Sequence, residues 1–422
     1  MREKALAAAA IACATAVAPP VGFAEAGSSD SPLAAPLPAN AVVAGARLAA
    51  LGNCAVCHTA AGGAPFAGGR PFHTQFGTLY STNITPDSET GLGRWSFGDF
   101  SRAMKSGVSR DGHRLYPAFP YPHFQGMTDV DLESVYRFLM TREAVRAVQP
   151  PNHLVFPLRL RPLMAGWNLL FLRRPAEPKR IPDRPDERRG KYLVDTLGHC
   201  AACHTPLNAL GAEKAGHAFQ GAVVEGWEAP ALTALLHRPK PWSVDQLSAY
   251  LRTGLASEHG MAAGPMRDVT QALAFADPAD VRAMASYLMT LQVPSAPTRT
   301  VATVAEQADS AQLHRGNTLF AAACASCHDN AAPMSAYGGR PSLSLGTAVN
   351  AQSPRNAVRF VLHGIRDQDS AGALYMPAYS ATLTNAQIAD VTAFLRARFS
   401  TGAPWRIDES YVAKLRKEKS EP

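Results

Sequence analysis

Residues 198–206, with the sequence GHCAACHTP, contain the pattern that decides how this chain folds. The core of the stretch is Cys-x-x-Cys-His at 200–204, and the same pattern occurs at 54–58 and 324–328. Two thiols spaced by three residues lie on one face of a helical turn, and each can form a thioether with one vinyl group of the same porphyrin. The histidine that follows can bind the iron as an axial ligand. The repeated pattern therefore predicts covalent attachment of three c-type haems.

The three motifs use six of the seven cysteines of the chain. The predicted thioether positions are Cys54, Cys57, Cys200, Cys203, Cys324 and Cys327, and the predicted axial histidines are His58, His204 and His328. A structural zinc site would need ligand pairs at other spacings, and a dithiol redox centre would not need a histidine after each second cysteine. The spacing thus favours haem over zinc, redox dithiols and disulfides.

The N-terminal segment has the features of an export signal. It starts with charged residues, continues as an apolar run from Ala5 to Pro19, and reaches an A-x-A site at 24–26. We therefore expect residues 1–26 to be a signal peptide and the mature chain to reside in the periplasm. Cys13 lies inside the apolar run. It is either discarded with the signal or a lipidation site, although Ala10 stands where such a site prefers leucine.

The charge and hydropathy of the chain limit its partners. The formal net charge is +7, but three haems would add about six negative charges through their propionates. No basic run is interleaved with aromatic residues, so the sequence argues against nucleic-acid binding. No segment after the signal reaches the roughly 18 consecutive apolar residues of a spanning helix, and the expected contact with the inner membrane is peripheral.

The chain repeats one arrangement three times. Each motif is preceded by a short apolar helix that contains a glycine 8 to 10 residues before the first cysteine: Gly45, Gly190 and Gly316. Each motif is followed, after loops rich in glycine and proline, by an amphipathic helix with a predicted N-cap residue: Thr128, Asp277 and Thr384. Gln387 completes a capping box with the third of these.

This layout resembles that of class I cytochrome c domains, in which the haem supplies much of the core of a unit of about 100 residues. The resemblance implies an all-α fold of three tandem domains, each wrapped round a covalent haem. The predicted organisation is domain 1 at 27–150, domain 2 at 186–295 and domain 3 at 307–402, with linkers at 151–185 and 296–306 and a tail at 403–422. Domain 1 is longer because of an insertion between Phe66 and Trp95.

The linker at 151–185 is rich in proline and arginine and contains a predicted apolar helix at 163–172. One interpretation is a semi-rigid spacer whose helix packs between domains. The other is an apolar surface, flanked by arginines, that docks on a partner subunit or on the membrane. The tail is expected to form a short helix on the surface.

A second iron ligand is expected in the loop before each closing helix. Met266 lies eleven residues before Asp277, and Met376 lies eight residues before Thr384. A methionine usually fills a core, but its recurrence at equivalent places in two repeats predicts ligation. Ligation by histidine and methionine gives a higher reduction potential than ligation by two histidines.

Domain 1 departs from this pattern. Phe119 stands nine residues before Thr128, where methionine is expected, and phenylalanine cannot bind iron. We predict His123 as the sixth ligand of this haem. His113, Met127 and an open site remain alternatives, although Met127 directly precedes the N-cap, a position from which a side chain packs on the helix.

Three further stretches carry a family resemblance: 83–87 (NITPD), 90–95 (TGLGRW) and 115–121 (LYPAFPY). Together with the three haem motifs, they resemble the triheme cytochrome c subunit of membrane-associated bacterial dehydrogenases. Members of that family serve quinoprotein alcohol dehydrogenases, flavoprotein gluconate or sorbitol dehydrogenases, and molybdenum hydroxylases acting on aldehydes or N-heteroaromatic compounds. Pro-Ala-Phe-Pro-Tyr with a nearby histidine is similar to the molybdenum-hydroxylase branch.

The resemblance implies an electron-transfer subunit that accepts electrons from a dehydrogenase and passes them to quinone, an oxidase or a soluble cytochrome. The chain has no GxGxxG, P-loop or flavin fingerprint, so substrate chemistry is expected in a partner and not in this chain. The alternative is a haem enzyme, similar to a peroxidase or oxidase, that uses an open site in domain 1. Phe119 supports that alternative. A haem-based sensor would need an output domain.

Overall fold

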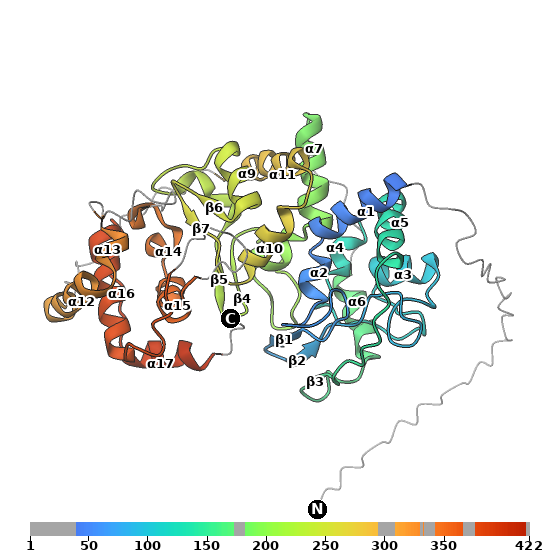
Figure 1. The fold of residues 1–422 in the computed structure, drawn as a ribbon, viewed down its shortest axis with the longest axis horizontal. Helices are drawn as coiled ribbons and strands as arrows, with labels where there is room; N and C mark the ends of the chain where they lie inside the picture. The colour runs from blue at the N-terminus through green and yellow to red at the C-terminus, as the bar shows by residue number, and fades with distance from the viewer. Residues whose placement is uncertain are drawn as a thin grey trace, which may run out of the picture. The chain divides into compact units, whose positions relative to one another are not determined.

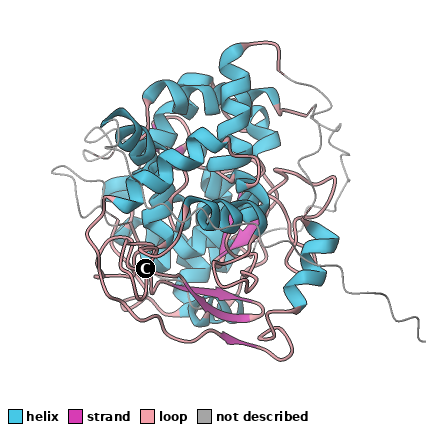
Figure 2. Cartoon of the chain, turned by 90° about the vertical axis from the view of Figure 1, so that its right-hand side faces the viewer, coloured by secondary structure: helices cyan, strands magenta, loops and turns pink. Residues whose placement is uncertain are grey.

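The computed structural model describes residues 39–172, 182–293, 309–329, 332, 342–365 and 376–418. The predicted signal peptide, including Cys13, and the predicted linker at 296–306 lie outside these residues. Within the described chain, helices predominate and short strands form three small sheets (Figure 1). Figure 2 shows the same balance of helix and strand from a second direction.

Domain 1 and the segment after it contain α1 (Ala39–Leu51), α2 (Cys54–Cys57), β1 (Pro71–Thr74), β2 (Gly77–Tyr80), α3 (Phe97–Ser106), α4 (Tyr121–Phe124), α5 (Asp129–Met140), β3 (His153–Leu154) and α6 (Leu163–Phe171). Domain 2 contains α7 (Pro185–Tyr192), η1 (Leu193–Leu197), α8 (Cys200–His204), β4 (Ala222–Val224), β5 (Trp227–Ala229), η2 (Leu232–His237), α9 (Val244–Thr253), β6 (Leu255–Ala256), β7 (Gly260–Met261), α10 (Pro265–Leu273) and α11 (Pro278–Thr290). Domain 3 contains α12 (Ser310–Ala323), α13 (Ala325–His328), η4 (Leu343–Leu345), α14 (Thr347–Asn350), α15 (Arg355–His363), α16 (Asn385–Phe399) and α17 (Glu409–Lys417).

Each domain is built on a crossed pair of helices, α1 with α5, α7 with α11 and α12 with α16 (Figure 1). The three glycines singled out in the sequence lie at these crossings. A Cβ added to Gly45, Gly190 or Gly316 would lie 2.0, 1.9 or 2.2 Å, respectively, from a carbonyl oxygen of the facing helix. No side chain fits in that space, so glycine allows the two helices to approach.

The predicted starts of the closing helices are confirmed. The Thr128 hydroxyl accepts a hydrogen bond from the backbone N–H of Asp131, and the Asp277 carboxylate accepts one from Ala279. Thr384 and Gln387 form the predicted capping box at the start of α16. These bonds satisfy N–H groups that have no partner within the first helical turn.

The all-α prediction missed the three small sheets. β1 and β2 form a hairpin in the long insertion of domain 1, and β3 extends that sheet from the linker. In domain 2, β4 pairs with β5 and β6 pairs with β7, all antiparallel. The strands are two to four residues long, too short for the alternation of polar and apolar residues that indicates a strand.

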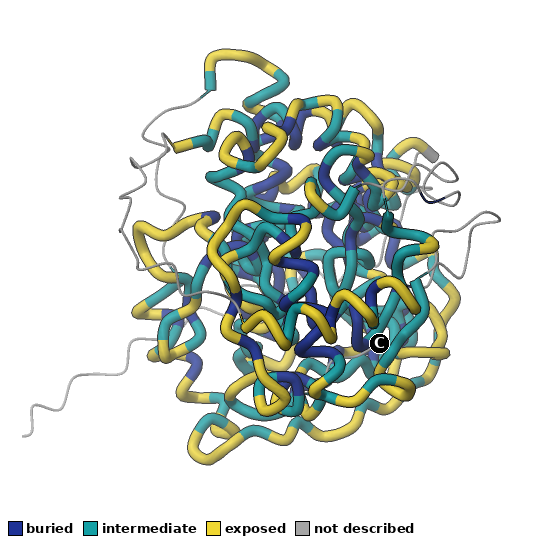
Figure 3. Tube along the Cα trace, turned by 90° about the vertical axis from the view of Figure 1, so that its left-hand side faces the viewer, coloured by how far each residue is buried: buried dark blue, intermediate teal, exposed yellow. Residues whose placement is uncertain are grey.

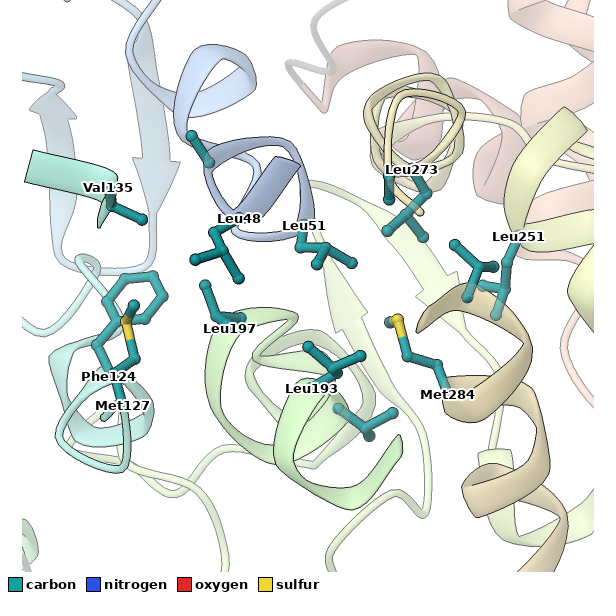
Figure 4. Close-up of a cluster of buried hydrophobic side chains, with 14 of the residues drawn as sticks. Leu48, Leu51, Phe124, Met127, Val135, Leu193, Leu197, Leu251, Leu273 and Met284 are labelled. Carbon is teal, nitrogen blue, oxygen red and sulfur yellow. The ribbon is translucent and has the colours of Figure 1, made fainter. Parts of the chain in front are cut away.

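Domains 1 and 2 share one hydrophobic core, whereas domain 3 has its own. The first cluster includes Leu48 and Leu51 of α1 together with Leu193 and Leu197 of η1. These four side chains point toward one another (Figure 4). The second cluster contains domain 3 residues alone, from Phe320 to Leu415. Buried segments are covered by exposed loops and helix faces (Figure 3).

The C-terminal tail forms the predicted helix, α17, but this helix does not simply rest on the surface. Val412 and Leu415 are fully buried in the core of domain 3, and α17 packs against α16 and α15. The tail is thus part of domain 3.

Candidate haem sites

The motif cysteines occupy two short helices, α2 and α8, and the start of α13. The residue before the first motif, Asn53, has φ 53°, and the residue before the second, His199, has φ 35°. Both lie in the left-handed region, which turns the chain sharply from the preceding helix into the motif. All six motif cysteines are half-buried, and burial raises the pKa of the Cys54 and Cys200 thiols to about 12.

Two of the predicted axial histidines are oriented by the backbone. Nδ1 of His58 lies 2.6 Å from the carbonyl oxygen of Thr82, and Nδ1 of His204 lies 2.8 Å from that of Pro230. A carbonyl can only accept, so each Nδ1 carries the proton and each Nε2 keeps a lone pair for a metal. Burial lowers the pKa of both imidazoles more than the carbonyl bond raises it. Both side chains are thus held in the neutral form that binds iron.

The loop behind His58 contains two of the stretches that carried the family resemblance. The Asn83 amide donates to the Thr90 hydroxyl at 2.9 Å and to the Val145 carbonyl at 2.7 Å. Its carbonyl accepts from the backbone N–H of Thr85 at 2.9 Å. These bonds fix the backbone at residue 82, which is the partner of His58.

A cavity of about 370 Å³ joins the second and third motifs. Its lining includes Cys200, Cys203, His204 and Met266 from domain 2 and Cys324, Cys327, His328 and Met376 from domain 3. The structure thus brings together eight of the twelve predicted site residues at one apolar cavity. Met266 is the second residue of α10, and Met376 forms a two-bond backbone bridge with Ile365. Iron ligation by the two methionines remains a prediction.

The polar groups of this cavity fit a haem. Arg238 lines it, and the Arg238 Nε is buried without a hydrogen-bond partner among the described residues. Burial lowers the pKa of this guanidinium, and Glu228 opposes the effect. A haem presents an apolar ring and two propionates, so apolar walls with one under-satisfied arginine suit it.

The predicted sixth ligand of domain 1 lies in a different environment. Nε2 of His123 lies 2.7 Å from Oε1 of Glu213, and Nδ1 lies 3.0 Å from the carbonyl oxygen of Asp195. Burial lowers the pKa of His123, but the bond with Glu213 outweighs it and the pKa is raised. Both nitrogens are therefore engaged by domain 2, and iron ligation by His123 would require one of these bonds to break.

The side chains of the other candidate ligands in domain 1 also make contacts with other protein groups. Met127 is 3% exposed and belongs to the shared core. His113 pairs with Asp111 at 2.5 Å near the surface. Phe119 packs against Phe124, with ring centroids 5.5 Å apart. None of these contacts identifies a sixth ligand for this haem.

One residue beside the first motif was not found by sequence reasoning. Arg70 is 13% exposed and donates to the carbonyl of Val56, inside the Cys54–Cys57 turn, at 2.8 Å. It also pairs with Asp268 of α10 at 3.3 Å and with Glu225 at 3.8 Å. An isolated arginine in a glycine-rich loop has no local pattern that would predict such contacts.

The cytochrome c family profile matches residues 42–143, 187–292 and 313–398. The chain belongs to the cytochrome c family. It is 35% identical to the gluconate 2-dehydrogenase cytochrome c subunit of Pantoea cypripedii, over 89% of each chain. It is 34% identical to the alcohol dehydrogenase (quinone) cytochrome c subunit of Gluconacetobacter polyoxogenes, over 88% of this chain and 83% of that one.

This cytochrome c is also 47% identical to a nicotinate dehydrogenase subunit of Pseudomonas putida, over 88% of its own length. It spans about a third of that relative, since the match covers 31% of the longer protein. The resemblance to dehydrogenase cytochrome c subunits is thus confirmed. None of the described helices is long and apolar enough to cross a membrane.

Proposed function

We propose that this cytochrome c binds three covalent haems and carries electrons from a partner dehydrogenase to quinone, an oxidase or another cytochrome. The observation that carries the proposal is the apolar cavity lined by two complete sets of predicted haem residues. Bound haem iron would supply one-electron redox chemistry. The cysteines would hold the ring, and the buried walls would exclude water.

The chain's own residues set how each iron would be held. The carbonyls of Thr82 and Pro230 fix the proton of His58 and His204 on Nδ1, which presents Nε2 to the metal. Met266 and Met376 would complete the second and third sites and raise their potentials. Substrate oxidation belongs to the partner enzyme in this proposal.

We propose a dehydrogenase of the molybdenum-hydroxylase type as the partner, in preference to a flavin or quinoprotein enzyme. The identity to the nicotinate dehydrogenase subunit, 47%, exceeds the 32% to 35% found with the gluconate, alcohol and fructose dehydrogenase subunits. Nicotinate is an N-heteroaromatic acid. The expected substrates of the complex are therefore N-heteroaromatic compounds.

Purification of the complex from membranes tests this function. The dehydrogenase should co-purify with the cytochrome, and addition of an N-heteroaromatic acid should reduce the haems, as read by visible absorbance. The double variant C200A/C203A should lose one of three haems per chain and still bind the partner. The proposal would be contradicted if the cytochrome were recovered without a dehydrogenase and the added acid did not reduce its haems.

We also propose that the cytochrome rests on the periplasmic face of the inner membrane through the segment at 151–172. One face of α6 packs on the protein, where Asn168 bonds to Tyr121 at 2.5 Å and Trp167 donates to the carbonyl of Leu210 at 3.0 Å. The other face and the preceding loop expose six large apolar side chains: Val155, Phe156, Leu160, Leu163, Leu169 and Leu170. Leu169 is 86% exposed.

The charge of this segment fits an anionic lipid surface. It contains two arginines and no acidic residue, and Arg159 is exposed, with its guanidinium 5.6 Å from the ring centroid of Phe156. An apolar face rimmed by arginine is typical of segments that lie in the membrane interface. The export signal predicted at 1–26 supports a periplasmic location.

Flotation with vesicles that contain phosphatidylglycerol tests the contact. L169Q/L170Q should bind the vesicles about a hundredfold less than the wild type or weaker still, because each leucine contributes about 1.5–3 kcal/mol when buried in an apolar medium. V130Q, at a residue of α5 that is 75% exposed, should bind normally. Normal flotation of L169Q/L170Q, with loss of dehydrogenase instead, would identify a protein interface.

A second function remains supported by domain 1. His123, Met127 and His113 are each engaged elsewhere, which favours an open iron site and hence a peroxidase-like or oxidase-like activity. Carbon monoxide added to the reduced protein separates the two functions. Stoichiometric binding at one haem supports the enzyme, and no binding supports electron transfer alone.

A further inference from the structure

Domain 3 is joined to the rest of the protein differently from the way domains 1 and 2 are joined. Domains 1 and 2 share a hydrophobic core and contact each other through α1, α2, α4, α10 and η1. The core of domain 3 contains no residue of domain 2 among those described. The main contact between described elements of domains 2 and 3 joins β5 to α15, which lie side by side in Figure 1.

The backbone of the β4–β5 hairpin is held by polar side chains of α15. The side-chain Oδ1 of Asn356 accepts a hydrogen bond from the backbone N–H of Glu228 at 2.9 Å. The side-chain Nδ2 of Asn356 donates one to the backbone carbonyl of Glu228 at 2.8 Å. Arg355 donates to the carbonyl of Gly226, at the hairpin turn, at 2.9 Å. Asn356 thus adds to the hairpin edge as a further strand would.

The hairpin also places Trp227 at the wall of the shared haem cavity. The indole packs on Gly264, where an added Cβ would lie 2.5 Å from the indole nitrogen. Its ring centroid lies 5.6 Å from that of Phe360, edge to face, on α15 of domain 3. Trp227 therefore touches both Gly264, the residue directly before α10 and its Met266, and Phe360, a wall residue of the third haem site.

The charges at this junction are arranged around the same hairpin. Arg359 is fully buried and lies with its guanidinium 5.8 Å from the Trp227 ring centroid. It pairs with Glu418 at 2.8 Å, and Arg355 pairs with the same carboxylate at 2.5 Å. Glu225, at the hairpin turn, pairs with Arg70 of domain 1.

We propose that domain 3 is a separately folded unit that docks on a fixed pair of domains 1 and 2, and that the β4–β5 hairpin is the docking element. Asn356 and Trp227 are the positioning residues that keep the second and third haem sites in one cavity. Polar contacts at a small interface allow domains to separate, whereas a shared apolar core does not. The inference rests on the proposed haem content.

The test uses the holoprotein and the variant N356A. The matched control is N350A, because the Asn350 side chain also makes two hydrogen bonds to the backbone, at 2.8 and 3.0 Å, but within domain 3. Small-angle X-ray scattering reports the radius of gyration, and flash photoreduction reports electron exchange between the second and third haems. Loss of the two bonds of Asn356 corresponds to a rise of about ten- to hundredfold in the undocked population.

N356A should therefore have a larger radius of gyration and slower exchange, whereas N350A should resemble the wild type in both. W227L should slow the exchange more than W405L, since Trp405 is equally buried and also lies under an arginine, Arg396, but does not line the cavity. An unchanged radius and exchange rate in N356A and W227L would overturn the docking proposal. A wild-type protein that shows no haem absorbance would overturn the proposed function instead.

Discussion

Replacement of Gly190 by alanine should weaken the shared core of domains 1 and 2. The added Cβ would lie 1.9 Å from the carbonyl oxygen of Ala283 and 2.9 Å from Cβ of Tyr287. Non-bonded atoms rest at about 3.5–4.0 Å, so α7 and α11 must separate. Overpacking costs about 1–3 kcal/mol, and the clash with the backbone places this site at the upper end. Alanine regains about 1 kcal/mol of helix propensity, which leaves a loss of about 2 kcal/mol.

Urea unfolding followed by far-ultraviolet circular dichroism measures this loss. The matched control is Gly166→Ala in α6, where no heavy atom lies within 4 Å of an added Cβ. That substitution should be neutral or stabilising by up to about 1 kcal/mol. If G190A unfolded at the urea concentration of the wild type or higher, the close crossing of α7 and α11 would not be what requires glycine.

Three further predictions address the haem sites and domain 3. M266H should lower the potential of the second haem, because two histidines give a lower potential than histidine and methionine; an unchanged potential in spectroelectrochemical titration would show that Met266 is not the ligand. R238Q should also lower that potential by removing a positive charge from the cavity, whereas R252Q, outside the cavity lining, should not. Burial raises the pKa of Glu418, but hydrogen bonds from Arg355 and Arg359 outweigh it and lower the pKa below that of an ordinary glutamate. The stabilisation is present above the unfolded-state pKa and is lost as the pH falls through the lowered folded-state value, so thermal unfolding of domain 3 should become pH-dependent in acid, and E418Q should lack that dependence.

Local patterns were enough to predict the helices that open and close each repeat, the helix of the linker and the tail helix, but not α3, α9, α10 and α15. The caps at Thr128, Asp277 and Thr384 and the helix at 163–172 depend on neighbouring residues, and the structure confirms each of them. The repeat predicted that Cys200, His204 and Met266 lie together, and likewise their counterparts in domain 3. It did not predict that both sets line one cavity. That the two sites open into one another depends on how two domains dock, and no local pattern contains that information.

The residues that join domains were missed for the same reason. Glu228 and Asn356 are 128 positions apart in the chain, and Arg70 meets Asp268 across 198 positions. His123 shows that a local pattern can also predict a role without revealing contacts made with another domain. Its place before a closing helix predicted a ligand within domain 1, but its hydrogen-bond partners lie in domain 2, so iron ligation by His123 stays a prediction.

The hydrogen bonds that orient His58 and His204 end on main-chain carbonyls, not on side chains. Substitution of Thr82 by another residue leaves that acceptor in place. The tautomer of each histidine therefore does not depend on which side chain follows the carbonyl that supports it. The amino-acid composition of these loops can vary while Nδ1 keeps the proton. What must be kept is the course of the backbone. At residue 82 that course depends on Asn83, whose amide bonds the loop to Thr90 and Val145.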